Sequence, residues 1–197
     1  AALAEVRSVE ARVQRALPAT VAATVLVRAV TVARDGITIR GMGSGSGVCI
    51  SADGEILTCA HVVELPGATL SVRCSDGREF PVRVVGADSR HDFALLRVDL
   101  PEVPPLPYAS LGRSADLAAG DWVVALGHPL RANRDNQPTV SVGIFKHRIA
   151  GLQAPAPTGS RVYPGALQHD APLFTGNSGG PLFDLAGRVI GINAAIT

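Results

Sequence analysis

The stretch that decides the fold is Thr175-Gly176-Asn177-Ser178-Gly179-Gly180-Pro181-Leu182. It places one small hydroxyl side chain among three glycines and continues into a short apolar run. Glycine adopts backbone angles that residues with a Cβ resist, so a turn here can present the Ser178 hydroxyl and aim neighbouring N–H groups at one point. Acyl transfer needs this combination of a nucleophile and donors for the oxyanion. A serine in such a turn is more often structural, so the prediction depends on residues upstream.

Two upstream residues complete a candidate catalytic group. His61 ends an apolar strand-like segment, and Asp92 stands directly before another one at 93–98. A carboxylate that enters a buried strand needs a partner, because burial of an unpaired charge is costly, and an N–H of His61 provides one. The imidazole can then remove the Ser178 proton while the carboxylate holds the ring in the right tautomer. We therefore predict His61, Asp92 and Ser178 as catalytic residues.

The composition indicates a globular chain and excludes several classes. Its 197 residues are 47% hydrophobic and 18% charged, which allows a sizeable core. A net charge of +1 gives no electrostatic reason to expect nucleic acid as a partner. No apolar run reaches the ~20 residues of a membrane span, so we expect none. The sequence opens without a signal-peptide pattern, and we expect a targeting segment to be absent or already removed.

We expect no metal and no cofactor. Cys49, Cys59 and Cys74 have no metal-ligand spacing; their odd number argues against a full disulfide framework, and one disulfide remains open. The glycines over 41–47 are not followed by the Lys-Ser/Thr and the helix of a phosphate loop. We interpret them as a close backbone approach near a site.

The hydrophobic pattern changes from helical to strand-like near residue 20. Apolar residues at helical spacing over 1–17 predict an amphipathic helix that Pro18 ends, so that 1–19 form an N-terminal segment. A Pro-rich connector at 99–107 separates two β-rich parts, 20–107 and 108–197, and 151–165 are predicted to be an exposed loop. The predicted strands, which indicate an all-β barrel or sandwich, are 21–33, 36–40, 47–50, 55–60, 69–74, 79–86, 93–98, 121–126, 138–149, 166–169, 181–184 and 188–195.

These motifs resemble those of trypsin-like serine proteases, and among them the HtrA/Deg-type proteases. The resemblance covers about residues 20–197, with matching segments at 43–48, 57–63, 91–96, 125–129, 168–171 and 176–182. It implies two perpendicular six-stranded antiparallel β-barrels with the site in the cleft between them. It also implies that His61 is the general base, Asp92 its orienting partner and Ser178 the nucleophile. By the same resemblance, the N–H groups of Gly176, Asn177 and Ser178 form the oxyanion hole.

Two features depart from the family pattern. Cys59 stands where members often carry Ala or Asn, and we interpret it as a small packing residue. The second barrel should have one more strand after 188–195, yet the sequence given ends at Thr197 and contains no PDZ domain. We therefore expect the last strand of the second barrel to be missing and the substrate pocket to be less supported.

The resemblance further implies a substrate pocket near 172–175 and 192–196. Its predicted lining residues are Leu173, Phe174, Thr175, Ile192, Asn193 and Ala194. Neither segment contains Asp or Glu, so a cationic side chain would enter without compensation. We predict a small or medium aliphatic residue before the cut bond. By family resemblance alone, the substrates are unfolded or misfolded proteins, the location is extracytoplasmic (periplasmic or secreted), and a homotrimer forms with residues 1–19 available for contact.

Three alternatives were weighed against this interpretation. The glycine-flanked serine also fits an α/β-hydrolase, but that fold needs a helix after the serine and a later acid and His, whereas a strand pattern follows Ser178. A protease-like scaffold that binds proteins without cutting them stays open. So does a protease held in a resting state until loops such as 130–138 or 151–165 become ordered.

Overall fold

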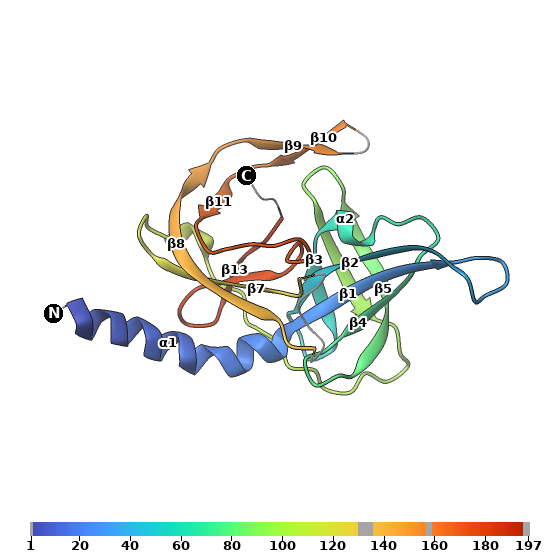
Figure 1. Ribbon diagram of the computed structural model, residues 1–197, viewed down its shortest axis with the longest axis horizontal. Coiled ribbons are helices and arrows are strands. Elements are labelled where there is room, and N and C mark those ends of the chain that lie inside the picture. Colours follow the sequence, from blue (N-terminus) through green and yellow to red (C-terminus); the bar gives the residue numbers. More distant parts are fainter. Residues whose placement is uncertain (1, 130–135, 157–158, 195–197) are drawn as a thin grey trace.

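The computed structural model describes residues 2–129, 136–156 and 159–194. A long helix, α1 (Ala2–Ala23), leads into two β-rich halves that lie side by side, the first with α2 and the second with the C-terminal strands (Figure 1). The mostly β architecture predicted from the sequence is confirmed.

The first half is a closed barrel. Its strands follow the order β1-β2-β3-β6-β5-β4, with bounds β1 (Thr24–Val32), β2 (Ile39–Cys49), β3 (Glu55–Thr58), β4 (Thr69–Arg73), β5 (Glu79–Asp88) and β6 (Phe93–Val98). Side chains alternate between the barrel interior and the outside, so that Ala94, Leu96 and Val98 of β6 are buried, as the two-residue period of a strand requires. Closure leaves every strand of this half with two neighbours.

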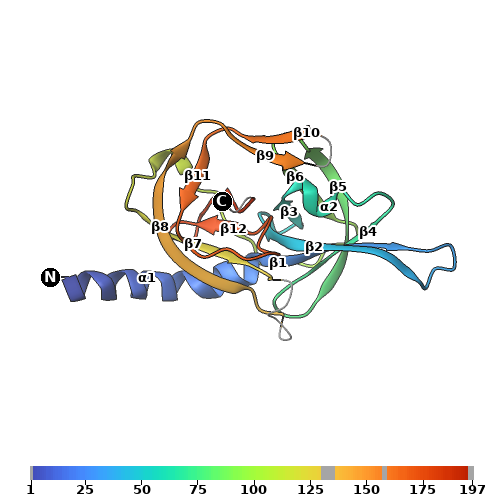
Figure 2. The same ribbon diagram turned by 45° about the horizontal axis from the view of Figure 1, so that its top comes forward.

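The second half is an open sheet over the described residues. Its order is β11-β8-β7-β12-β13, with bounds β7 (Trp122–Gly127), β8 (Thr139–Ile149), β11 (Ala166–His169), β12 (Pro181–Phe183) and β13 (Val189–Ile192). A separate hairpin, β9 (Leu152–Ala156) and β10 (Gly159–Tyr163), reaches from this sheet toward the first barrel in two views (Figures 1 and 2). This half is therefore a half-barrel and not a closed six-stranded one.

A hydrophobic cluster joins the two halves and α1. Ala23 at the end of α1 and Val48 of β2 are fully buried, and they pack in one cluster with Leu126 of β7 and Phe183 of β12. The segment between β6 and β7 contains a short 3-10 helix, η1 (Ser114–Asp116). Burial of this shared cluster fixes the position of one half relative to the other.

The helix is longer than the sequence predicted. Pro18 lies inside α1, which continues to Ala23, so the prediction that Pro18 ends the helix is wrong. Proline removes one backbone donor, and the single Thr20 hydroxyl proton is shared between Ala16 O and Leu17 O, at 3.2 Å each. Burial of the last turn in the shared cluster outweighs the lost hydrogen bond.

Two further local predictions are corrected. Residues 151–165 were predicted to be a loop. They contain both strands of the β9–β10 hairpin, in which Arg161 pairs with Ala154. The runs 36–40 and 47–50 are not separate strands, because β2 is continuous from Ile39 to Cys49. The glycines of this stretch lie within the strand and leave room for neighbouring backbone.

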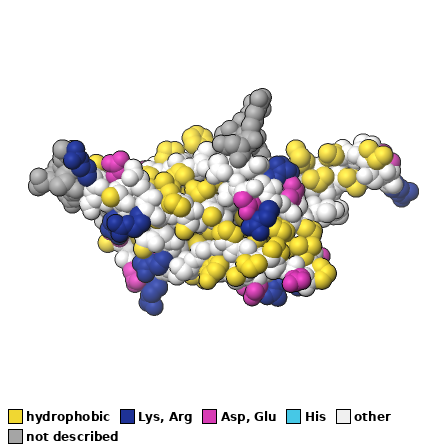
Figure 3. All heavy atoms as spheres, turned by 90° about the horizontal axis from the view of Figure 1, so that it is seen from below, with side chains coloured by type: hydrophobic (Ala, Val, Ile, Leu, Met, Phe, Trp, Pro, Cys, Tyr) yellow, Lys and Arg dark blue, Asp and Glu magenta, His cyan; other side chains and the backbone are white. Residues whose placement is uncertain are grey.

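The β1–β2 hairpin has exposed hydrophobic side chains. Ile37, Ile39 and Met42 are exposed on the β1–β2 hairpin, which projects from the barrel and shows hydrophobic side chains in the space-filling view (Figure 3).

Cys49, Cys59 and Cys74 are buried free thiols. In the described part of the chain, no helix combines the length and apolar character needed to cross a membrane.

Candidate active site

His61 and Asp92 are joined across two neighbouring strands. Thr58 at the end of β3 pairs with Ala94 of β6, and a single helical turn, α2 (Ala60–Val63), follows β3 directly. His61 therefore lies in a helical turn rather than at the end of a strand. His61 Nδ1 is 2.8 Å from Asp92 Oδ2 and 3.0 Å from Oδ1, and the His61 backbone N–H donates to Oδ1 at 3.0 Å.

The Asp92 carboxylate is held ionised in a buried place. Its side chain is 0% exposed, whereas that of His61 is 31% exposed. Burial raises the pKa of Asp92, but hydrogen bonds from His61 and Tyr163 outweigh it and lower the pKa below 3.8. Asp92 also has φ +62, a left-handed backbone conformation that costs about 1–3 kcal/mol for a residue with a side chain. Strain of this kind is common where a side chain must be aimed at a site.

Glycines shape the turn 175–180 that carries Ser178. We call it the nucleophile turn, after the predicted role of Ser178. Gly176 and Gly179 have φ +103 and +85, which glycine adopts without steric cost. A Cβ on Gly179 would overlap Ser46 O and Thr58 Oγ1 and lie 3.0 Å from Cys59 N. The nucleophile turn therefore packs directly against the backbone two residues before His61.

Ser46 of β2 connects the nucleophile turn to the first barrel. It is fully buried. Its N–H donates to Ser178 O at 2.8 Å, and its hydroxyl donates to Gly176 O at 2.7 Å and accepts from His128 N–H at 2.8 Å. Ser46 O in turn accepts from the Thr58 hydroxyl at 2.7 Å. One serine thus ties the turn to β2, β3 and the end of β7.

The glycine spacing before Ser46 has a structural reason. A Cβ on Gly45 would lie 2.9 Å from Ser178 O and 2.6 Å from Val62 of α2. Gly45 therefore lies against both the nucleophile turn and the helical turn that carries His61. This agrees with the interpretation of the glycine-rich stretch as a close backbone approach.

The amide groups of the turn differ in their use. Asn177 N–H donates to Phe174 O at 2.9 Å, so it is not free to stabilise an oxyanion. Among the described residues, the N–H groups of Gly176 and Ser178 donate no hydrogen bond. Of the three predicted donors, two N–H groups, those of Gly176 and Ser178, therefore remain available in this turn.

No hydrogen bond joins Ser178 to His61 within the described residues, although His61 Nδ1 is paired with Asp92. Hydrogen bonds of this kind are often long without substrate and shorten in the complex. The half-buried Ser178 nevertheless lies on the turn that packs against Thr58 and Cys59, next to the helical turn of His61.

Cys59 packs beneath the site. Its thiol is fully buried and donates to Asn193 O at 3.5 Å, and burial raises the pKa of the thiol. Donor atoms of Cys59, His61 and Asp92 lie within 4.8 Å of one another, yet each side chain already has a hydrogen-bond partner. The chemistry of this group therefore fits packing and acid–base pairing better than metal binding.

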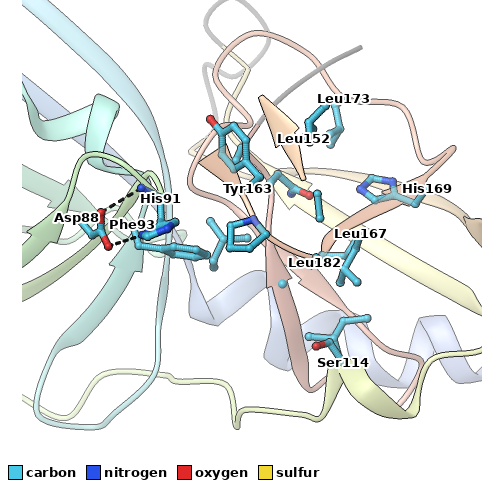
Figure 4. A pocket seen from close by; sticks show the side chains of 18 residues that line it. Asp88, His91, Phe93, Ser114, Leu152, Tyr163, Leu167, His169, Leu173 and Leu182 are labelled. Atoms are coloured by element: carbon cyan, nitrogen blue, oxygen red, sulfur yellow. Dashed lines mark hydrogen bonds and ion pairs between the residues drawn. The ribbon is translucent and has the colours of Figure 1, made fainter. Parts of the chain in front are cut away.

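A pocket of about 550 Å³ lies between the first barrel and the inner face of the second sheet. It is lined by four of the six predicted residues, Leu173, Ile192, Asn193 and Ala194; exposed Phe174 and Thr175 do not line it. Figure 4 shows the further apolar side chains Leu152, Leu167 and Leu182 around it. Among its described lining residues the one carboxylate is Asp88, which is hydrogen-bonded to His91 Nδ1 at 2.7 Å.

Sequence reasoning missed three residues at the site. Ser46 lies in the family-like segment 43–48, but nothing local indicates its partners. Arg161 and Tyr163 of β10 both approach Asp92. Because their segment is rich in Pro and Gly, the sequence predicted a loop and not the strand that carries them. The sequence did contain a weak signal, because the apolar residues Leu152, Ala154 and Ala156 alternate with Gln153 and Pro155.

Comparisons with known proteins agree with this geometry. Residues 45–192 match the model of the trypsin-like peptidase domain. A probable periplasmic serine endoprotease, DegP-like, from Pseudomonas fluorescens is 44% identical over 152 residues, 77% of this chain and 29% of that protein. A putative serine protease HhoB from Synechocystis is 41% identical over 157 residues, 80% of this chain and 35% of that protein.

A solved structure gives the same result in three dimensions. An HtrA-type protease with a tripeptide superimposes with a TM-score of 0.72 at 32% identity, over 91% of this chain and 53% of that one. The chain thus spans about half of that structure and about a third or less of the curated relatives. These matches confirm the resemblance to HtrA-type proteases found in the motifs.

Proposed function

The chain belongs to the trypsin-like peptidase family, and we propose that it is a serine endopeptidase that uses His61, Asp92 and Ser178. The observation that carries this proposal is the His61–Asp92 pair, at 2.8 Å, beside a glycine turn that presents a serine. The names of the relatives, serine endoprotease and serine protease, support it.

The proposed reaction is acyl transfer to serine followed by hydrolysis. His61 Nε2 takes the proton of the Ser178 hydroxyl as its oxygen attacks the substrate carbonyl, and Asp92 stabilises the imidazolium that forms. The free N–H groups of Gly176 and Ser178 stabilise the oxyanion. His61 then gives its proton to the leaving amine, and water releases the acyl group by the same route in reverse.

We propose that the pocket accepts a small or medium aliphatic side chain before the cut bond. Its apolar lining supports this, and Asp88 is already paired with His91, so a cationic side chain would lose its hydration without a free partner. Peptides that differ only at this position, with Val, Ala, Leu or Arg, provide the test. Fastest cleavage after Arg would contradict the proposal.

The finer biological role is also a proposal. Because relatives are named periplasmic endoproteases, we propose an extracytoplasmic location and unfolded or misfolded proteins as substrates. The homotrimer expected from the family, with residues 1–19 at the contact, is proposed with it, and sedimentation of the purified protein tests the assembly. Cleavage of a reduced, unfolded protein but not of its native form is the expected result for the substrate class.

A covalent probe tests the central proposal. A fluorophosphonate should label Ser178 in the protein, and Ser178→Ala should lose labelling and peptide hydrolysis by about 10⁴-fold or more. The control is the heat-unfolded protein, which should not be labelled. Equal labelling of the Ser178→Ala variant would show that another residue reacts and would reject Ser178 as the nucleophile.

A resting or non-cutting form is the second candidate. It is favoured by the missing Ser178–His61 hydrogen bond among the described residues. If the folded protein binds an unfolded polypeptide but is neither labelled nor able to cut it, this second candidate replaces the first.

A further inference from the structure

The Asp92 carboxylate accepts more hydrogen bonds than His61 supplies. The ring and the backbone N–H of His61 both reach it. An ionised carboxylate offers about four acceptor sites, and an unfilled site on a buried charge is costly. The Tyr163 hydroxyl fills one of them, donating to Asp92 Oδ2 at 2.9 Å.

This extra donor comes from the other half of the molecule. Tyr163 is the last residue of β10, and Val162 N–H donates to Arg90 O at 2.8 Å, which fixes the strand beside the segment that precedes Asp92. Alternate residues of a strand point to the same side, so Arg161 and Tyr163 both face the carboxylate. Figure 4 shows the Tyr163 ring between first-barrel residues, such as Phe93, and His169 of the second sheet.

Arg161 acts on the same carboxylate by charge. Its Nε lies 3.4 Å from Asp92 Oδ1, and its Nη2 lies 3.3 Å from Glu64 Oε2. The side chain is 12% exposed, and its Nε forms no hydrogen bond with the described residues. Arg161 therefore contributes Coulomb attraction, whereas the directed contact comes from the Tyr163 hydroxyl.

We propose that Tyr163 is a positioning residue of the proposed protease site: its hydroxyl fixes the Asp92 carboxylate in the orientation that holds the His61 ring, with Arg161 adding charge stabilisation. This inference rests on the proposed function. It makes the β9–β10 hairpin of the second half a part of the acid–base pair of the first.

The phenol suits this role as a donor. Burial, followed by the hydrogen bond to Asp92, raises the pKa of Tyr163 above its usual value of 10.0, so the hydroxyl keeps its proton over the neutral range. It therefore takes no part in proton transfer and acts only through Asp92.

The first experiment removes the hydroxyl alone. Tyr163→Phe keeps the ring that lines the pocket and should lower the maximal rate of fluorophosphonate labelling about tenfold, because a hydrogen bond to a charged group is lost. The half-saturating probe concentration should stay unchanged, because the probe does not contact this hydroxyl. Tyr108→Phe is the matched control: it removes the other tyrosine hydroxyl of the chain, from a residue that is 55% exposed, and should label like the wild type.

A spectroscopic readout separates positioning from simple packing. The proton NMR resonance of the His61 Nδ1–H···Asp92 hydrogen bond should shift or broaden in Tyr163→Phe and stay unchanged in Tyr108→Phe. A purely structural tyrosine would lower the melting temperature without moving this resonance or the maximal labelling rate.

The outcomes distinguish this inference from the proposed function. If the wild type is not labelled, the proposed function fails; if wild type and Tyr163→Phe label equally fast with the same resonance, the positioning role alone is overturned. If the Tyr163→Phe variant does not fold, the contact can still be tested on the wild-type protein by NMR. A hydroxyl proton bound to a buried carboxylate exchanges slowly with water, so a resolved Tyr163 hydroxyl resonance is expected, and rapid exchange would reject the contact.

Discussion

The closed barrel and the open sheet hold their functional residues in different ways. In the first half, His61 and Asp92 meet across the paired strands β3 and β6, so their contact belongs to one barrel. In the second half, the turn of Ser178 has hydrogen bonds within its own half, such as Gly179 N–H to Asn193 O, and is also held from outside by Ser46 of the first barrel. The acid–base pair is thus a property of one half, whereas the nucleophile geometry is a property of the interface.

The same difference appears in the direction of the contacts. Asp92 receives Tyr163 from the second half, and the nucleophile turn receives Ser46 from the first. Each half therefore contributes one hydroxyl group to the site of the other. Separation of the halves would disturb both the carboxylate and the nucleophile turn.

The largest expected effect breaks the first-barrel pair itself. Asp92→Asn should lower the maximal labelling rate about 10⁴-fold, because an amide no longer holds the His61 ring in the required tautomer. Stopped-flow or manual labelling with the fluorophosphonate measures this. A loss below about tenfold would mean that the pair does not control the reaction.

The next effect concerns the fit between the two halves. Gly179→Ala places a Cβ against Ser46 O and Thr58 Oγ1 at φ +85 and should lower the free energy of unfolding by about 4 kcal/mol, from strain and overpacking together. Gly159→Ala is the matched control, since Gly159 has φ +94 but no atom within 4 Å of a Cβ. Gly159→Ala should lower the free energy of unfolding only by the cost of the left-handed backbone conformation, about 1–2 kcal/mol. Urea unfolding compares them, and equal losses would show that the close approach at Gly179 does not matter.

A smaller effect tests the hydroxyl that crosses from the first half to the second. Ser46→Ala leaves the Gly176 carbonyl and the His128 N–H without their partner, which should cost about 2 kcal/mol of stability and lower the labelling rate about 10²-fold through a displaced oxyanion hole. Ser44→Ala, two residues earlier on β2, is the control, since its hydroxyl forms no hydrogen bond with the described residues. Similar behaviour of the two variants would place the control of the turn elsewhere.

The smallest expected effect is a pH dependence of stability that differs between the two halves. Burial lowers the pKa of His169 in the second sheet below 6.5, so the unfolded chain binds this proton more readily than the folded one. Its contribution to stability is complete above pH 6.5 and is lost as the pH falls below that value. His169→Gln should remove that part of the pH dependence, because the burial of a titratable ring causes it.

The first half should respond to acid at lower pH. The folded pKa of Asp92 lies below 3.8, so its contribution is complete above pH 3.8 and is lost as the pH falls through the folded pKa. Urea unfolding above and below each of these values, for wild type, His169→Gln and Asp92→Asn, checks both ranges. An unchanged slope in His169→Gln would remove His169 as a source of acid sensitivity.

The strands of both halves were predictable because their pattern is local. A short apolar run identifies strands such as β6, and the glycines at 176 and 179 indicate the turn that presents Ser178. The errors arose where tertiary packing outweighed local preference. Pro18 is kept in α1 by the buried cluster at its end, and the Pro-rich 151–165 segment becomes a hairpin whose strand β10 is hydrogen-bonded to the first barrel at Arg90.

The sequence by itself determined the β architecture and the family, and it predicted three candidate catalytic residues, because strand periodicity and turn stereochemistry act over a few residues. The sequence predicted the His61–Asp92 pair, but only the tertiary structure gave its geometry and showed that Ser46 holds the turn of Ser178 and that Tyr163 reaches Asp92. These partners lie 31 to 130 positions apart along the chain. Sheet register and the packing of one half on the other set such contacts, and no short stretch of sequence encodes either.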